Sequence, residues 1–143
     1  MQVKKLRRQS SMLEVYIDGA SAGNPGSSGI GIFIKGEGHQ IRISEPVGMM
    51  DNHTAEFHAL IRGLKEAQKL GSSLVSVRSD SKIVVSSIEK RYAKHYAHFI
   101  DEALPLIDSF DLFFIKWIPD DQNKAADRLA REAILMNTNE KRD

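Results

Sequence analysis

A glycine-rich segment between two apolar runs constrains the fold most strongly. It reads DGASAGNPGSSG, begins at Asp18 and follows a run of β-forming residues at 13–17. A Walker-type nucleotide loop needs a Lys–Ser or Lys–Thr pair after its last glycine, and a dinucleotide-binding turn needs a helix at the same place. Instead, Ile30, Ile32 and Ile34 alternate with other residues, which predicts a strand. The segment therefore predicts a hairpin that holds Asp18 at the end of its first strand.

The rest of the chain changes from strand to helix periodicity. Residues 40–47 alternate weakly, and the short link KGEGH before them predicts a second hairpin. The later elements are predicted as a helix over 57–67, a strand over 74–77, a helix capped by Asp80 or Ser81, a helix around 100–107, a strand over 112–118 and a helix that Asn123 can cap. The order β-β-β-α-β-α-α-β-α predicts an α/β fold, in which a five-stranded mixed sheet is flanked by helices.

Length and composition limit the class of protein. A chain of 143 residues predicts one domain, which we place at 13–136, between a basic, flexible arm at 1–12 and a polar tail at 137–143. The arm is either a solvated tail or a contact for nucleic-acid phosphates. The chain has no cysteine, which excludes a disulfide framework and thiolate zinc sites and leads us to expect a reducing, cytoplasmic location. No apolar run reaches membrane-spanning length, so no membrane partner is expected.

Four acids stand at strand ends or near helix starts. They are Asp18, Glu56, Asp80 and Asp127. Singly, each is more often a helix cap or an ordinary surface acid. If the first and fourth strands are parallel neighbours, however, Asp18 and Asp80 emerge side by side. Clustered carboxylates repel one another unless a hard cation such as Mg²⁺ binds between them, and two such ions about 4 Å apart can hydrolyse a phosphodiester.

The motifs around these acids resemble those of the type 1 ribonuclease H family. They read DGAS from Asp18 followed by NPG, NxxAExxAL around Glu56, SDS around Asp80 and NxxADRLA around Asp127. They occur in the family's order and span residues 13–135. The resemblance implies a ribonuclease H-like fold, whose order of elements is the one expected above.

The resemblance also implies an activity. It is metal-dependent endonucleolytic cleavage of the RNA strand of RNA–DNA hybrids by a two-metal-ion mechanism, which leaves 5′-phosphate and 3′-hydroxyl ends. All four acids would be catalytic and would bind two Mg²⁺ or Mn²⁺ ions. In the family, the counterpart of Asp18 bridges both ions, that of Asp80 shares one and that of Asp127 serves the second. The counterpart of Glu56 lies near the RNA 2′-hydroxyl groups.

The resemblance implies substrate contacts beside the acids. Asn24 and Asn52 match residues that contact the minor groove, where RNA displays its 2′-hydroxyl groups. The full predicted set of substrate-binding residues is Gly19, Ala20, Ser21, Asn24, Asn52, His53 and Asn123. No small-molecule cofactor is expected, and the chain is expected to be a monomer.

Three departures from the family pattern bear on activity. The loop IPDDQN before the last helix is short and lacks the mobile histidine of many relatives, as in the short-loop branch. The basic protrusion is reduced to the segment 90–95, KRYAKH. Asp51 stands where relatives often have a phosphate-binding threonine, and an acid there would repel phosphate. We still expect cleavage, with a lower affinity for the hybrid.

Two other functions stay open at this point. One is a non-catalytic module that binds RNA–DNA hybrids or double-stranded RNA on the same fold. The other is a related nuclease that acts on RNA–DNA junctions or double-stranded RNA. The four intact acids argue against a pure binding module, because clustered negative charge facing phosphates weakens binding.

Overall fold

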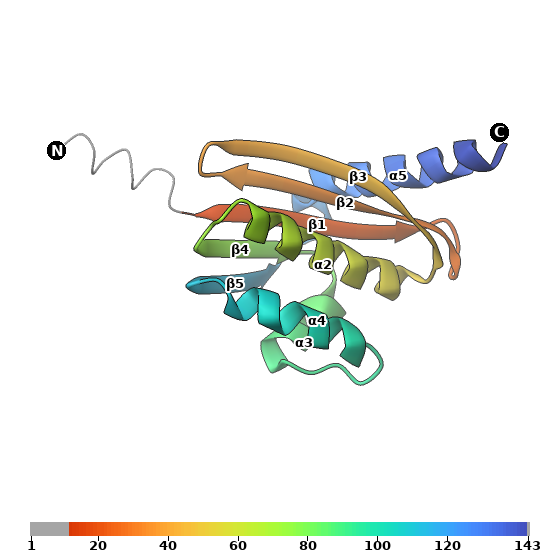
Figure 1. The fold of residues 1–143 in the computed structure, drawn as a ribbon. Helices are drawn as coiled ribbons and strands as arrows, with labels where there is room; N and C mark the ends of the chain where they lie inside the picture. The colour runs from red at the N-terminus through yellow and green to blue at the C-terminus, as the bar shows by residue number, and fades with distance from the viewer. Residues whose placement is uncertain (1–11, 143) are drawn as a thin grey trace.

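The chain folds into a mixed sheet with helices on both of its faces (Figure 1). The computed structural model describes residues 12–142, and the side chains of residues 12–136. Its elements are β1 (Leu13–Ser21), β2 (Gly26–Gly36), β3 (His39–Met50), α2 (Asn52–Lys69), β4 (Leu74–Ser79), α3 (Lys82–Lys90), α4 (Ala97–Asp108), β5 (Leu112–Trp117), the 3₁₀ turn η1 (Asp120–Gln122) and α5 (Lys124–Arg142). The predicted order of elements and the predicted α/β class are confirmed.

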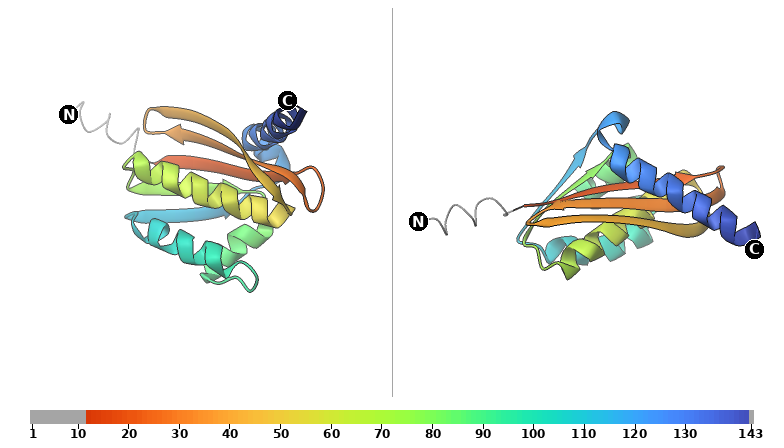
Figure 2. Two further views of the ribbon diagram at one scale, coloured as in Figure 1. Left: turned by 45° about the vertical axis from the view of Figure 1, so that its right-hand side comes forward. Right: turned by 90° about the horizontal axis from the view of Figure 1, so that it is seen from above.

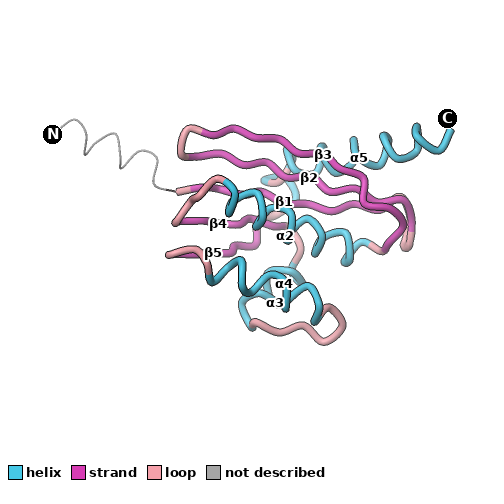
Figure 3. Tube along the Cα trace, in the orientation of Figure 1, coloured by secondary structure: helices cyan, strands magenta, loops and turns pink. Residues whose placement is uncertain are grey.

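The order of the strands in the sheet is β3-β2-β1-β4-β5 (Figure 3). The pairs β1–β2 and β2–β3 are antiparallel, whereas β1–β4 and β4–β5 are parallel. Ile17 of β1 is the register partner of Ser79 of β4. Since the two strands run in the same direction, the next residues, Asp18 and Asp80, lie side by side, where β4 ends and β1 continues in its pairing with β2. The condition set by the sequence analysis for their pairing is therefore met.

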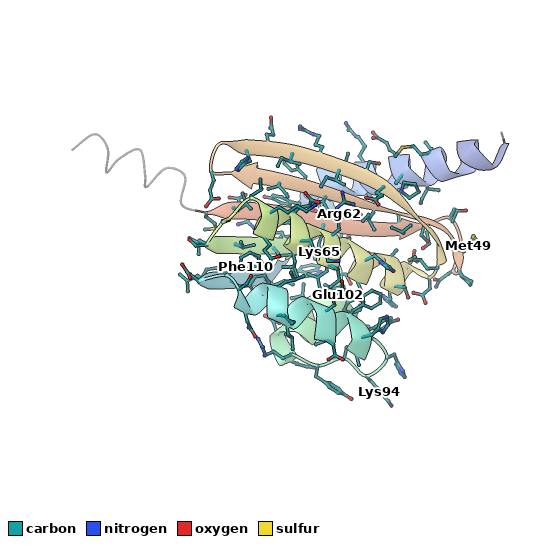
Figure 4. All side chains as sticks on the ribbon, in the orientation of Figure 1. Met49, Arg62, Lys65, Lys94, Glu102 and Phe110 are labelled. Atoms are coloured by element: carbon teal, nitrogen blue, oxygen red, sulfur yellow. The ribbon has the colours of Figure 1, made fainter. Side chains whose placement is uncertain are left out.

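Helices cover the two faces of the sheet unequally. Helices α2 and α4 lie on one face and α5 lies on the other (Figure 2). An ion pair between Lys65 of α2 and Glu102 of α4, at 2.9 Å, links the two helices on the first face (Figure 4). On the other face α5 approaches β2 so closely that a Cβ on Gly31 would overlap the Ala126 carbonyl. Glycine at that position therefore fixes the height of α5 above the sheet.

The core lies between the sheet and α2. Alternate residues of β1 and residues of α2 at helical spacing are fully buried there, as the periodicity of the sequence predicts. They include Leu13, Val15, Ile17, Phe57, Leu60 and Leu64. This packing makes the end of β1 and the start of α2 a rigid support for the side chains that leave them.

The last helix runs into the segment that the sequence analysis set apart. Helix α5 continues to Arg142 and so includes most of the polar tail predicted at 137–143. The segment NTNEKR contains neither glycine nor proline, so no residue forces the helix to end. The predicted basic arm falls almost wholly on residues 1–11, which lie outside the described residues. Within residues 12–142, no helix is both long enough and apolar enough to cross a lipid bilayer.

Candidate active site

Three of the four predicted acids form a tight cluster beside the end of β4. The prediction that Asp18 ends its strand is wrong, because β1 continues past it to Ser21 and stays paired with β2. Carboxylate oxygens of Asp18, Glu56 and Asp80 all lie within 4.8 Å of one another. Asp18 is only 5% exposed. The parallel register of β1 and β4 places the two aspartates, and the start of α2 supplies Glu56. The long-range pairing of strands thus brings together acids that are far apart in the sequence.

Two local features bring α2 up to the end of β1. A Cβ on Gly19 would overlap the backbone of Ala55, so only glycine lets the strand and the helix approach this closely. Asp51 caps the helix, because its Oδ1 accepts a hydrogen bond from the Thr54 backbone N–H at 2.7 Å. This hydrogen bond lowers the pKa of Asp51. Asp51 therefore has a structural role that the sequence analysis, which considered only its effect on phosphate, did not anticipate.

The electrostatics of the cluster disfavour three ionised carboxylates. Burial, followed by the charges of Asp80 and Asp127, raises the pKa of Asp18 well above its ordinary value. Burial, followed by the charge of Asp18, raises the pKa of Glu56 in the same way. Burial also raises the pKa of Asp80, although a hydrogen bond from Asn123 opposes this effect. Without a cation, the cluster can hold its negative charge only at a cost in free energy.

The donor set fits a hard divalent cation. Glu56 Oε2 is buried and has no hydrogen-bond partner among the described residues, although buried carboxylate oxygens normally have one. Carboxylate oxygens are the ligands that Mg²⁺ and Mn²⁺ prefer. A cation among the three acids would satisfy this oxygen and neutralise the repulsion. These residues are therefore suited to hold the metal that the sequence analysis expected.

The fourth acid, Asp127, faces the cluster across an open cleft. It lies on α5 and lines the same cleft as the other three acids. The cleft is also lined by Gly19, Ala20, Ser21 and Asn52, which were among the predicted substrate contacts. Both carboxylate oxygens of Asp127 accept hydrogen bonds from Arg131 Nε, at 3.1 and 3.0 Å. Asp127 is thus near the cluster but is paired with a cation of its own chain.

Asn123 is a correction to the predicted substrate contacts. It is 1% exposed, and its Nδ2 donates hydrogen bonds to the Ile17 carbonyl at 2.9 Å and to Asp80 Oδ2 at 3.2 Å. A side chain that is this buried, with its donors already used, orients Asp80 rather than meeting a substrate. The sequence analysis missed this role because asparagine is usually exposed and its motif lies far from β1 in the sequence.

Asn24, Asn52 and His53 are exposed, and Asn52 lines the cleft. The Asn52 backbone N–H donates to Asn24 Oδ1 at 3.0 Å, so the turn after β1 is joined to the start of α2. The His53 ring meets the Tyr96 ring edge-on, with 6.4 Å between the ring centres. These three residues remain predicted contacts, and their exposure leaves them accessible to a ligand.

Two charged residues of the cleft were not singled out from the sequence. Asp120 of η1 and Arg131 of α5 both line the cleft. The position of Asp120 depends on how the short loop after β5 folds back, for which the sequence carries no signal. Arg131 could have been found, because it stands four residues after Asp127 on a helix and an Asp–Arg pair at that spacing commonly interacts.

Some of the basic and aromatic residues near 90–96 contact other parts of the fold, and others stay exposed. Tyr96 stacks on buried Phe57, with 4.7 Å between the ring centres, and therefore packs against the core. Arg91 pairs with Asp108 of α4 at 2.8 Å. Lys94 remains exposed beside them (Figure 4). The surface left for a nucleic acid is therefore smaller than the composition of this segment suggests.

The chain is similar to known sequences over most of its length. Residues 16–133 match the model of the family described as reverse transcriptase-like. The protein named "Putative hydrolase EbsB" from Enterococcus faecalis is 45% identical over 127 residues, which are 86% of this chain and 94% of that protein. Ribonuclease HI from Halobacterium salinarum is 31% identical over 127 residues, which are 85% of this chain but 64% of that protein, just under two thirds of its length.

Solved structures give the same result. The RNase H1 of Halobacterium salinarum superposes with a TM-score of 0.80 and 30% identity, over 86% of this chain and 97% of that one. LC11-RNase H1, solved in complex with an RNA/DNA hybrid, superposes with a TM-score of 0.79 and 30% identity, over 88% of this chain and 99% of that one. The similarity therefore includes the strands and helices that carry the four acids.

Proposed function

Since this chain belongs to the ribonuclease H family and is a ribonuclease H-type hydrolase, we propose that it cleaves the RNA strand of RNA–DNA hybrids by a two-metal-ion mechanism. The products would carry 5′-phosphate and 3′-hydroxyl ends. The observation that supports the proposal best is the buried cluster of Asp18, Glu56 and Asp80, in which one glutamate oxygen has no partner among the described residues. In a protein that only bound nucleic acid, such a cluster would lower the affinity, because the carboxylates repel phosphates.

The roles that we propose for the acids are those that the family resemblance implies. Asp18, which is close enough to Asp80 and Asp127 for their charges to raise its pKa, would be shared by both ions, with Asp80 holding the first and Asp127 the second. When bound, Mg²⁺ or Mn²⁺ lowers the pKa of a water molecule and stabilises charge on the leaving oxygen. The protein holds its carboxylates at fixed positions for this purpose. Asn123 orients Asp80, and Gly19 lets Glu56 approach.

The substrate side of the proposal rests on the exposed rim. Asn24 and Asn52 stand together at the mouth of the cleft, where a wide, shallow groove could approach them. An RNA–DNA hybrid presents such a groove together with its 2′-hydroxyl groups. Asparagine both donates and accepts hydrogen bonds, so it can bind a hydroxyl group and a base edge. The relative solved with an RNA/DNA hybrid, LC11-RNase H1, supports this choice of substrate.

The test is cleavage by the wild-type protein and by Asp80→Asn. Labelled hybrid, double-stranded RNA and single-stranded RNA would each be incubated with Mg²⁺ and with Mn²⁺. We expect cleavage of the hybrid in at least one metal and a loss of about 10²-fold or more in Asp80→Asn, because one ligand of the ion is removed. Asp111→Asn is the matched control, since Asp111 is exposed and lies outside the cleft.

Each other result has a definite meaning. Equal rates for the wild type and Asp80→Asn in both metals would reject the metal assignment. Binding of hybrid without cleavage in either metal would favour the non-catalytic module instead. Faster cleavage of double-stranded RNA than of hybrid would identify a nuclease with a shifted substrate.

A further inference from the structure

Arg131 stands at the mouth of the cleft, one helical turn after Asp127. Its Nε donates to both oxygens of the Asp127 carboxylate, at 3.1 and 3.0 Å. The pair is open to solvent, with the Arg131 side chain 73% exposed and that of Asp127 39% exposed. An exposed ion pair of this kind is weak and can be exchanged for another partner.

The other three acids have no such compensation. Among the described residues, neither Asp18, Glu56 nor Asp80 forms an ion pair with a lysine, arginine or histidine. The nearest polar partners are neutral: the Gly19 backbone N–H for Asp18, at 3.0 Å, and the Asn123 amide for Asp80. Of the four predicted acids, only Asp127 therefore forms an ion pair among the described residues.

We propose that Arg131 is a positioning residue that occupies Asp127 until a second metal ion displaces it. This inference rests on the proposed two-ion mechanism. The first ion would enter among Asp18, Glu56 and Asp80, none of which forms an ion pair with a cation among the described residues. The second ion would need Asp127, whose two oxygens are both engaged by Arg131. Arg131 therefore lowers the affinity of the second ion, which favours binding of the first ion before it.

The geometry makes this competition direct. The two carboxylate oxygens of Asp127 share the single N–H of Arg131 Nε, so an ion that binds them from the Arg131 side must displace this hydrogen bond. The positive charge of Arg131 also lies beside the place that the ion must take, and like charges repel. Both effects act in the same direction, so removing the charge of Arg131 strengthens binding of the second ion.

The test is a titration of Mn²⁺ into metal-free full-length protein without substrate. Calorimetry and the paramagnetic resonance of free Mn²⁺ give the number of bound ions and the affinity of each. The variant is Arg131→Gln, which keeps the length of the side chain and removes its charge. The control is Arg128→Gln, which removes the same charge from an exposed residue of α5 that forms no ion pair with any described side chain.

We expect the second ion to bind about two- to fivefold more tightly to Arg131→Gln than to the wild type, as the release of an exposed ion pair predicts. If the wild type binds one ion over the whole titration, Arg131→Gln should bind a second. The first ion should bind equally to the Arg131→Gln and Arg128→Gln variants. The gain should vanish when Asp127→Asn is added to Arg131→Gln, and it should shrink in concentrated salt.

The opposite results would overturn the inference. Arg131 would instead orient Asp127 for the metal if Arg131→Gln bound the second ion more weakly than the wild type. An equal gain in Arg128→Gln would mean that only net charge matters, and no gain in any variant would mean that Arg131 does not compete. Because the titration uses no nucleic acid, its outcome is independent of whether the wild type cleaves a hybrid.

Discussion

Asp18→Asn should stabilise the metal-free protein while it abolishes cleavage. Asp18 is 5% exposed and faces Asp80 and Asp127. The substitution keeps the shape of the side chain and the oxygen that accepts the Gly19 N–H at 3.0 Å, and it removes the charge. The new amide can donate to Glu56 or Asp127, which interact with Asp18 in the folded protein. The cost of burying a charge is therefore removed without leaving a cavity.

The magnitude follows from the pKa. Burial, with the charges of Asp80 and Asp127, raises the pKa of Asp18 from 3.8 to about 8. Because the folded protein holds this proton more tightly than the unfolded chain, the free energy of unfolding falls as the pH rises from 3.8 towards about 8. At about 1.4 kcal/mol per pH unit, the loss by pH 7 is at most about 4 kcal/mol. Since the amide must also be buried, we expect a gain of about 1–3 kcal/mol, or about 3–10 °C in Tm.

The assay is thermal unfolding in chelator at pH 5 and pH 7.5, followed by addition of Mg²⁺. The Tm of Asp18→Asn should exceed that of the wild type at pH 7.5, and the difference should shrink at pH 5, where the wild-type carboxyl is protonated. Mg²⁺ should raise the Tm of the wild type more than that of the variant. Asp111→Asn, at an exposed position, should stay within about 0.5 kcal/mol of the wild type. A variant that unfolds at or below the wild-type temperature in chelator at pH 7.5 would refute the reasoning.

Three further predictions concern the supports of the site. Asn123→Ala should lower the free energy of unfolding, measured in urea, by about 1–3 kcal/mol, because the buried Ile17 carbonyl loses its donor. The variant should also cleave the hybrid more slowly, because Asp80 loses its orienting amide. Unchanged stability and cleavage would contradict this prediction. Asp51→Ala should lower the free energy of unfolding by about 1 kcal/mol, because the helix cap is lost. Asp51→Thr should keep most of the cap and should bind the hybrid more tightly in a filter assay, since the acid no longer repels phosphate. Equal binding by Asp51→Thr and the wild type would show that Asp51 does not face the phosphates. Gly31→Ala should lower the free energy of unfolding by about 1–3 kcal/mol or more, because its Cβ would push α5 away from β2. The rise in Tm produced by Mn²⁺ should be smaller than in the wild type, because Asp127 moves with α5. An equal rise in Tm would show that metal binding does not depend on the position of α5.

The sequence was sufficient for the parts of the site that depend on periodicity. The alternation of apolar residues in the first strands and the helical spacing after residue 57 predicted the order of elements. That order, with a parallel pairing of the first and fourth strands, placed Asp18 beside Asp80, and the structure has this pairing. Both inferences use repeating patterns, in which several residues support one conclusion.

The parts that the sequence did not predict depend on single side chains. Asn123 turns inwards because the Ile17 carbonyl, more than a hundred residues away in the chain, needs a donor at that point. Tyr96, which follows the basic segment, packs against the core because Phe57 offers it a stacking partner. Each is settled by one long-range contact, and no local pattern records such a contact. The sequence could name these residues but could not give their roles.

The loop before α5 shows how the missing histidine changes the electrostatics of the site. In its place the short loop puts Asp120 on the wall of the cleft. Burial is the main cause of the raised pKa values of Glu56 and Asp80, and the charge of Asp120 adds to both. An added acid attracts cations into the cleft and holds them there, whereas a histidine would compete with them when protonated. The only cation of the protein that opposes this effect at the cleft, within the described side chains, is Arg131, so the balance between Asp120 and Arg131 would set how readily the second ion enters and leaves.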